Sequence, residues 1–227
     1  LPNLPEQRPT PPTAANRDAD YITAGYEATL LLIRQAYYGG ISYMDEQIGS
    51  IVRRLRSLGQ LENTVIVLTS DHGNMLGELG RMGCETPYDG ATHVPCMLHY
   101  EAGFEITGGL DRVADTTCLA PTLLELAGLE VPDGFGSPSA KELVTVVGAD
   151  WDEAAFQEFG FRGVRTPGWK LVEPGEHPGW EPQLYDLQKD PRETANLYGK
   201  PEAAAAQQEL AARLQAWKET TPAPPSV

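Results

Sequence analysis

The feature that most constrains the fold of this chain is a short apolar run that ends just before polar side chains. Residues 64–69 (TVIVLT) are apolar or β-branched throughout, without the polar alternation of a half-exposed strand. Such a run predicts a buried strand covered on both faces of a sheet. Asp71 and His72 follow it closely. Because open α/β sheets bind ligands at the carboxyl ends of their strands, this strand end is the first candidate for a site.

A long helix is predicted before this strand, from Asp18 to Leu58. Asp18 or Asp20 is placed to cap its start, and Gly59 lies just past its end. The glycine pair at 39–40 predicts a kink or a close packing contact. A helix, a short loop and a buried strand make half of a β-α-β unit, so the chain is predicted to be α/β with this helix facing the core. The apolar residues that recur at helical spacing are Ile41, Met44, Ile48, Ile51, Val52 and Leu55.

Shorter elements are predicted downstream, where turn residues divide the apolar segments. The predicted strands are Pro95 to Tyr100, short antiparallel strands within Glu158 to Val172, and Gln183 to Leu187, with Glu173 to Pro182 as the connection. The predicted helices are Thr116 to Leu129 and the alanine-rich Pro201 to Trp217.

These elements group into two regions with a connector and a tail. Residues 18–135 are predicted to form a partial α/β sheet flanked by helices, and residues 136–220 a small α+β subdomain with a short antiparallel sheet and a helix. Residues 1–17 form a proline-rich connector without the basic and apolar regions of a signal peptide. Residues 221–227 form an extended or disordered tail. Because a connector joins two parts, we expect the chain to be the downstream piece of a longer protein.

Composition and charge disfavour several classes of protein. With 41% hydrophobic residues among 227, the chain has enough apolar material for one sizeable core. Its net charge of -15 repels phosphates, and no apolar run approaches the roughly 20 residues of a membrane-spanning helix, so neither a nucleic acid nor a membrane is expected as a partner. The charge is explained by solubility, or by carboxylates that gather around a divalent cation. Cys84, Cys96 and Cys118 lack the spacing of a disulfide framework or a zinc site.

Asp71 and His72 combine two kinds of metal ligand at the predicted strand end. A carboxylate offers a hard oxygen and an imidazole a nitrogen, and both can reach one cation from adjacent positions on a tight turn. Gly73 permits a close backbone approach there. The alternative is that Asp71 caps the following turn and His72 is a satisfied surface residue.

Several further stretches, in a fixed order, extend this signal over most of the chain. Together with the run from Val65 to Tyr100, they resemble the sulfatase family of the alkaline phosphatase superfamily, although Cys118 stands where that family has Asp. The stretches are YYGGISYMD (37–45), ATHVP (91–95), CLAPTLLELAG (118–128), RTPGWKL (165–171), and LYDL (184–187) with DPRETANL (190–197).

The resemblance implies a partial alkaline-phosphatase-like sheet and the hydrolysis of sulfate esters with a divalent cation, usually Ca²⁺, with Mg²⁺ or Mn²⁺ as alternatives. Asp71 and His72 match the second of the family's two pairs of metal ligands. The family's nucleophile is a formylglycine made within Cys-x-Pro-Ser-Arg or Cys-x-Ala-x-Arg, and no cysteine here begins such a motif. The first acidic pair is also missing. The chain therefore resembles only the C-terminal half of a sulfatase, contains no catalytic residue of its own, and is expected to be inactive or nearly so alone.

The matched region also departs from the family pattern. Cys84 occupies the usual position of a lysine that contacts sulfate, and Leu79 the position where many members have His. A thiol does not replace an ammonium group in binding sulfate, so Cys84 is interpreted as a partly buried apolar residue rather than a catalytic thiolate. His93 is interpreted as a supporting residue, and Arg165 and Lys170 as surface charges.

Two alternatives to a sulfatase remain open. One is a phosphodiesterase or phosphonate monoester hydrolase of the same superfamily, and the other is a non-catalytic pseudo-enzyme or binding fragment, which Leu79 and Cys84 favour. A sulfated small molecule or glycan is the expected substrate of the parent enzyme. An incomplete sheet leaves an unpaired edge, so self-association or association with the missing N-terminal half is expected. The family suggests a periplasmic or secreted location.

Overall fold

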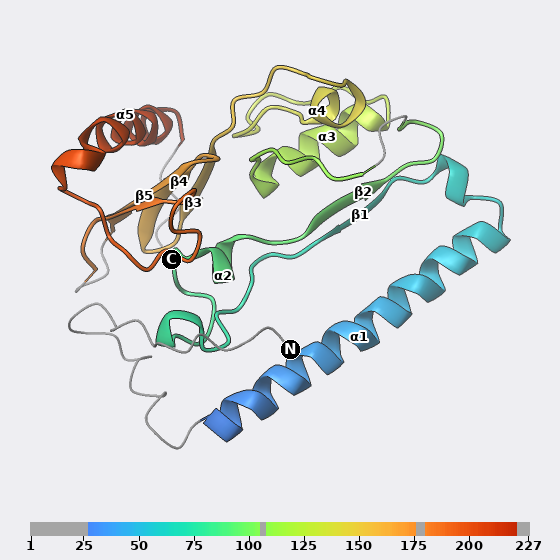
Figure 1. Ribbon diagram of the computed structural model, residues 1–227. Coiled ribbons are helices and arrows are strands. Elements are labelled where there is room, and N and C mark those ends of the chain that lie inside the picture. Colours follow the sequence, from blue (N-terminus) through green and yellow to red (C-terminus); the bar gives the residue numbers. More distant parts are fainter. Residues whose placement is uncertain (1–26, 105–107, 176–179, 222–227) are drawn as a thin grey trace. The chain divides into compact units, whose positions relative to one another are not determined.

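The computed structural model describes residues 27–104, 108–175 and 180–221 (Figure 1). The chain divides into two compact units. Of the described residues, those from 27 to 62 and Val67–Met97 form the first, and Asn63–Ile66 with those from Leu98 onward form the second. The α/β class predicted from the sequence is confirmed, with helices and two small sheets. The domain boundaries predicted after residues 17 and 135 stay predictions.

The first unit begins with one long helix, α1 (Glu27–Ser57). It ends within one residue of the predicted Leu58, where Gly59 takes a left-handed φ of 66°, and basic side chains in its last turn favour that end of the helix dipole. The predicted start, with Asp18 and Asp20, lies outside the described residues. Figure 1 shows α1 running on through the glycine pair at 39–40. A Cβ at either glycine would meet no described atom within 4 Å, so none of the described residues makes the predicted close packing contact.

The prediction that α1 faces a core is also wrong for this chain. Its side chains are mostly exposed, including Ile41 at 49% and Ile51 at 63%. No other helix or strand among the described residues packs extensively against it. The helical spacing therefore identifies an apolar face correctly, but the described residues do not supply its cover.

Two strands flank the loops of the first unit. β1 (Ile66–Thr69) and β2 (Cys96–His99) are neighbours in a two-stranded sheet, at the positions predicted for strands. The predicted burial of β1 on both faces is wrong, because most of β1 is only half-buried. Most of β2 is exposed. A two-stranded sheet leaves one edge of each strand without a hydrogen-bonded neighbour. In the sequence, the short helix η2 (Leu61–Asn63) precedes β1. Two more, η3 (Glu78–Gly80) and α2 (Asp89–Thr92), lie between β1 and β2.

After β2, the chain of the second unit continues with three short helices, η4 (Thr116–Cys118), α3 (Leu119–Leu126) and α4 (Lys141–Thr145). The side chain of Asp115 caps η4 by accepting from the Thr117 amide at 3.0 Å. The buried Thr122 hydroxyl donates to the Cys118 carbonyl at 2.6 Å and accepts from the Ala140 amide at 2.8 Å. This one side chain links α3 to the start of α4, and the predicted helix over Thr116 to Leu129 is confirmed with an earlier end.

The second sheet is antiparallel with the order β3-β4-β5-β6. The strands are β3 (Ala155–Glu158), β4 (Phe161–Arg165), β5 (Trp169–Pro174) and β6 (Gln183–Asp186). Phe156, Val164, Leu171 and Leu184 are register partners, so they share one face of the sheet. After η5 (Pro201–Ala203), the helix α5 (Ala204–Thr220) packs Leu210 and Leu214 against this row. The predicted antiparallel sheet and final helix are confirmed.

The opposite face of this sheet holds a buried ion pair. Lys170 Nζ lies 2.6 Å from Glu193 Oε1, with side-chain exposures of 1% and 3%. The prediction that Lys170 is a surface charge is therefore wrong. The strand pleat places Lys170 on the face opposite its neighbour Leu171, and Glu193, at a left-handed φ of 57°, supplies its countercharge.

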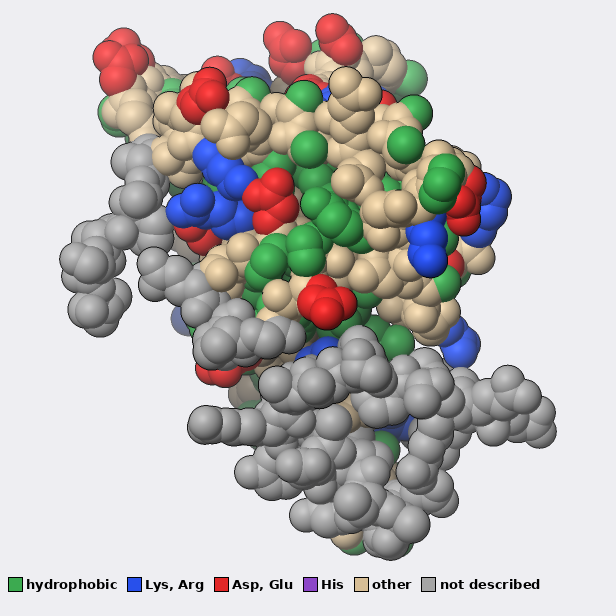
Figure 2. Space-filling view, turned by 90° about the vertical axis from the view of Figure 1, so that its left-hand side faces the viewer, with side chains coloured by type: hydrophobic (Ala, Val, Ile, Leu, Met, Phe, Trp, Pro, Cys, Tyr) green, Lys and Arg blue, Asp and Glu red, His purple; other side chains and the backbone are tan. Residues whose placement is uncertain are grey.

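Charges of both signs are interspersed on the face shown in Figure 2, with hydrophobic side chains between them. Large hydrophobic side chains that are at least half exposed include Phe159 and Val147. Within residues 27–104, 108–175 and 180–221, none of the helices combines the length and apolar character needed to cross a membrane.

Candidate metal centre

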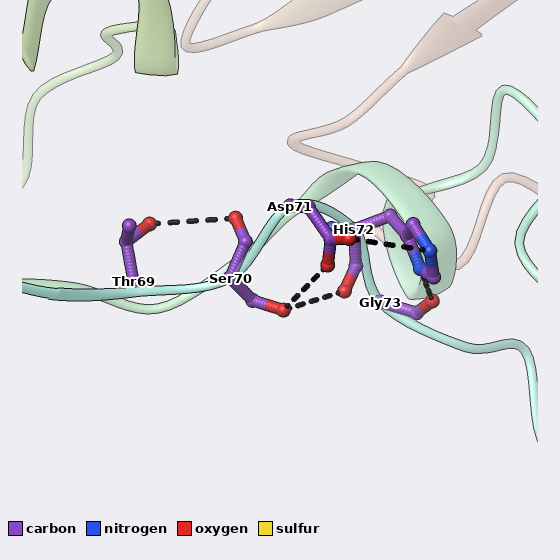
Figure 3. A network of polar contacts seen from close by, with 5 residues as sticks. All are labelled: Thr69, Ser70, Asp71, His72 and Gly73. Carbon is purple, nitrogen blue, oxygen red and sulfur yellow. Dashed lines mark hydrogen bonds and ion pairs between the residues drawn. The ribbon is translucent and has the colours of Figure 1, made fainter.

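The structure places Asp71 and His72 where the sequence predicts them, immediately beyond the end of β1. β1 ends at Thr69, and the chain then turns through Ser70 into these two residues (Figure 3). The Asp71 side chain is 85% exposed and the His72 side chain 53% exposed. Both donors are therefore accessible to an ion.

The hydroxyl of Ser70 and the backbone amide of His72 fix the turn. Ser70 Oγ donates to the His72 carbonyl at 2.8 Å and lies 3.4 Å from Asp71 Oδ1. The His72 amide donates to Asp71 Oδ1 at 2.9 Å. This amide, followed by the nearby His72 ring, holds the pKa of the Asp71 carboxyl below its ordinary value. Asp71 thus carries a carboxylate with one oxygen engaged by the backbone.

The ring of His72 is oriented by the next residue. Its Nδ1 lies 2.8 Å from the Gly73 carbonyl oxygen. Because a carbonyl only accepts hydrogen bonds, the neutral ring must carry its proton on Nδ1. The lone pair of Nε2 is then available, and Nε2 lies 3.7 Å from Asp71 Oδ2. Such a backbone contact to the second ring nitrogen is typical of metal-binding histidines.

Gly73 joins the turn to α2 through a close backbone contact. Its amide donates to the Ala91 carbonyl at 2.7 Å. A Cβ at this position would lie 2.3 Å from the carbonyl oxygen of Gly90. Gly73 is therefore required for packing against α2. This is a different reason from the approach to a cation that the sequence suggested.

The loop that follows contains several left-handed residues. Leu76 and Leu79 have φ values of 48° and 51°, unusual for branched side chains, and three glycines of the loop also have positive φ. Arg34 of α1 donates from Nε to the Leu76 carbonyl at 2.7 Å. The buried guanidinium of Arg81 lies over the Tyr88 ring, 5.0 Å from its centroid. Contacts with α1 and Tyr88 therefore hold this loop in place.

The remaining residues that the sequence singled out do not join Asp71 and His72 in a cluster. Cys84 is half-buried and free, as interpreted from the sequence. His93 is exposed just after α2, and Lys170 in the second unit is paired with Glu193. The sequence analysis overlooked Ser70, although a serine directly before Asp at a strand end is a recognisable signal for such a turn.

Two ligands do not complete a metal site. Calcium takes six to eight oxygen ligands and zinc about four ligands in all. In the part of the chain that the structure describes, no three His, Cys, Asp or Glu side chains gather closely enough to hold an ion. The carboxylate and the neutral imidazole fit a divalent cation chemically, as part of a ligand set that needs donors from elsewhere.

Comparison with known families gives two matches that overlap along the chain. A family model described as "Sulfatase" matches residues 4–129, more than half of the chain. A second, described as "N-sulphoglucosamine sulphohydrolase, C-terminal", matches residues 77–220. The candidate turn lies within the first match, and the four-stranded sheet lies within the second.

Curated relatives are similar over about three quarters of this chain. An N-acetylglucosamine-6-O-sulfatase from Bacteroides thetaiotaomicron is 32% identical over 188 residues, which is 77% of this chain and 33% of the relative. An arylsulfatase from Clostridium perfringens is 32% identical over 178 residues, which is 74% of this chain and 36% of the relative. The chain thus spans about a third of the length of these relatives.

Solved structures show the same partial coverage. A complex with the substrate D-glucosamine-2-N,6-O-disulfate matches with a TM-score of 0.73 and 32% identity, covering 79% of this chain and 39% of the other. A phosphonate monoester hydrolase of Agrobacterium radiobacter matches with a TM-score of 0.75 and 28% identity, covering 84% and 42%. The fold found here is therefore part of a larger one.

Proposed function

Because this chain belongs to the sulfatase family, we propose that it supplies two metal ligands, Asp71 and His72, to an enzyme that hydrolyses sulfate esters. The observation that carries the proposal is the turn after β1, where a carboxylate and an oriented imidazole lie accessible and 3.7 Å apart. The strand-end position matches the place where open α/β sheets bind their ligands.

The chemistry proposed for this turn is ligand positioning. Asp71 offers an oxygen that stays ionised because the His72 amide donates to the same carboxylate. His72 offers Nε2 because the Gly73 carbonyl holds the proton on Nδ1. A bound divalent cation, which we propose to be Ca²⁺ with Mg²⁺ or Mn²⁺ as alternatives, would supply Lewis acidity toward a sulfate oxygen.

The nucleophile and the remaining ligands are proposed to come from outside this chain. Cys84, Cys96 and Cys118 are followed by ETPY, MLHY and LAPT, and none of these is a formylglycine motif. We therefore expect no turnover from this chain alone. The expected substrate of the whole enzyme is a sulfated small molecule or glycan, in line with the substrate named for one structural relative.

Calorimetric titration of Ca²⁺ into the chain tests the metal role. The expected result is a weak binding isotherm that Asp71→Ala removes. Asp133→Ala is the matched control, because Asp133 is also an exposed aspartate but lies in the second unit. Identical heats for the unaltered chain and Asp71→Ala would contradict the metal role, since the control corrects for general loss of negative charge.

A phosphonate monoester hydrolase is the second candidate. Its specific support is the structural match to such an enzyme at a TM-score of 0.75, as high as that of the substrate complex. Parallel assays of a longer protein that contains this chain, with an aryl sulfate and a phosphonate monoester, would separate the two. A higher kcat/KM for the phosphonate would favour the second candidate.

A further inference from the structure

A single hydroxyl group contacts both residues of the candidate metal pair. Ser70, between the end of β1 and Asp71, is half-buried, whereas Asp71 and His72 are exposed. Its Oγ donates to the His72 carbonyl at 2.8 Å and lies 3.4 Å from Asp71 Oδ1 (Figure 3). A hydroxyl has one proton to donate, so the shorter contact, to the backbone carbonyl, is the hydrogen bond that this proton makes.

The peptide unit that joins His72 to Gly73 is held at both of its polar groups. Its carbonyl oxygen accepts the hydrogen bond from Ser70 Oγ at 2.8 Å. Its amide, on Gly73, donates to the carbonyl of Ala91 in α2 at 2.7 Å. Because a trans peptide unit is planar and its two polar groups point in opposite directions, the two bonds together restrict its rotation. Without the Ser70 hydroxyl, the unit is held from the α2 side alone.

The orientation of this peptide unit bears on the imidazole ring of His72. The carbonyl of Gly73, the next polar group along the chain, contacts the ring at Nδ1 over 2.8 Å. The ring therefore takes its direction from a backbone atom just beyond the held peptide unit. A rotation of that unit would move the Gly73 carbonyl and, with it, the opposite ring nitrogen Nε2. Ser70 thus acts on the ring through the backbone.

The carboxylate of Asp71 is oriented by the same turn. The His72 amide donates to Oδ1 at 2.9 Å, and Oδ1 is also the oxygen that lies near Ser70 Oγ. Oδ2 is the oxygen that faces His72 Nε2, at 3.7 Å. The turn therefore presents one oxygen and one nitrogen toward the same point, and both depend on the backbone around His72.

We propose that Ser70 is a positioning residue for the two metal ligands, because its hydroxyl holds the His72–Gly73 peptide unit so that Asp71 Oδ2 and His72 Nε2 reach one cation together. This proposal rests on the proposed function, since it needs a cation at this turn. Removing a group that orients metal ligands typically weakens metal binding by roughly 10- to 100-fold. Water can replace part of a lost bond at this exposed turn, so we expect the lower end of that range, about tenfold.

Two substitutions of similar shape isolate the hydroxyl. Threonine and valine are both β-branched, but only threonine keeps a hydroxyl group that can donate to the His72 carbonyl. The probe is Mn²⁺, titrated into the full chain, with the electron paramagnetic resonance signal of the free ion reporting the Kd. We expect Ser70→Thr to keep the Kd within about twofold of the unaltered chain, and Ser70→Val to raise it about tenfold.

Ser57→Val is the matched control. Ser57 Oγ also donates to a backbone carbonyl at 2.8 Å, that of Arg54 at the end of α1. This variant should leave the Kd for Mn²⁺ unchanged. Equal Kd values for Ser70→Thr and Ser70→Val would overturn the proposal, and so would an equal rise in Ser57→Val.

A merely structural role for Ser70 predicts a different pattern. In that case, Ser70→Val would weaken the fold and the metal binding together. For positioning, we expect the urea midpoint of Ser70→Val to match that of the unaltered chain, while the NMR shifts of the His72 ring change in the metal-free protein. A lower urea midpoint, or unchanged ring shifts, would overturn the positioning role.

Asp71→Ala separates failure of this proposal from failure of the proposed function. If Asp71→Ala removes Mn²⁺ binding and Ser70→Val leaves it unchanged, Ser70 is not a positioning residue and the metal role stands. If Asp71→Ala binds Mn²⁺ as tightly as the unaltered chain does, the proposed function fails, and the role of Ser70 fails with it.

Discussion

The helices α1 and α5 are both long, yet among the described residues only α5 has its apolar face covered. α5 presses Leu210 and Leu214 against the four-stranded sheet, and these side chains are 2% and 0% exposed. α1 has 31 residues against 17 for α5, and its Ile41 and Ile51 remain about half or more exposed. The difference shows that an apolar stripe reports which face of a helix needs cover and does not report which chain provides it.

The same contrast holds for the charged pairs of the two units. Lys170 and Glu193 are buried and paired at 2.6 Å within the second unit. Asp71 and His72 are exposed, and their facing donor atoms are 3.7 Å apart. The buried pair of the second unit is satisfied within that unit, whereas the donor atoms of Asp71 and His72 in the first unit face solvent.

The largest expected effect is in the second unit. Lys170→Met should lower the free energy of unfolding by about 3–5 kcal/mol, because it leaves the Glu193 carboxylate buried without a countercharge. Urea denaturation measures the change. Lys189→Met is the control, since Lys189 is 85% exposed and its pair with Asp186 should contribute no more than about 1 kcal/mol. Equal effects of the two variants would contradict the contrast.

The next test compares the two helices directly. Leu214→Ala should lower the free energy of unfolding by about 2–5 kcal/mol, because it opens a cavity against the sheet. Ile51→Ala should change it by less than about 0.5 kcal/mol in the isolated chain, because Ile51 is already 63% exposed. A loss from Ile51→Ala as large as that from Leu214→Ala would show that the face of α1 with Ile41 and Ile51 is covered in solution.

A smaller effect is expected at the candidate site. Gly73→Ala should lower the free energy of unfolding by about 1–3 kcal/mol, since its Cβ would meet the Gly90 carbonyl at 2.3 Å. Gly39→Ala in α1 should instead raise it by about 0.5–1 kcal/mol, because it removes helix-interior glycine at a position with open space around the new Cβ. Thermal unfolding of both variants measures these two changes, which should have opposite signs. No change in stability for Gly73→Ala would refute the close packing of the turn on α2.

The smallest effect concerns pH. The folded-state pKa of Asp71 is depressed, chiefly by the His72 amide, so its contribution to stability is present above the unfolded pKa and is lost as pH falls through the folded pKa. NMR titration of the Asp71 carboxyl should give a pKa below the ordinary value of an aspartate side chain. A pKa at the ordinary value would mean that the turn does not persist in solution.

How much was predictable from the sequence differs between the two regions. The order of strands and helices, the end of α1 near Gly59 and the antiparallel C-terminal sheet follow from local patterns, because spacing and turn residues act within a few positions. The burial of α1 and β1 did not follow, because it depends on partners distant in sequence or outside the described residues. The position of Asp71 and His72 after a strand was predictable for the same local reason.

The buried state of Lys170 was not predictable, since its partner Glu193 lies 23 residues away and reaches it through a left-handed backbone position. The role of Gly73 was also misjudged. Its backbone lies close to the carbonyl of Gly90, and no pattern near Gly73 in the sequence indicates that contact. Contacts between distant segments are the common reason for these errors.

The most direct test of the central claim is paramagnetic broadening by Mn²⁺ in the isotope-labelled chain. At low metal concentration, the account predicts broadening centred on the amides of Ser70, Asp71, His72 and Gly73, and its loss in Asp71→Ala. Broadening that is spread over the other acidic residues and unchanged in Asp71→Ala would contradict the claim that this turn supplies metal ligands.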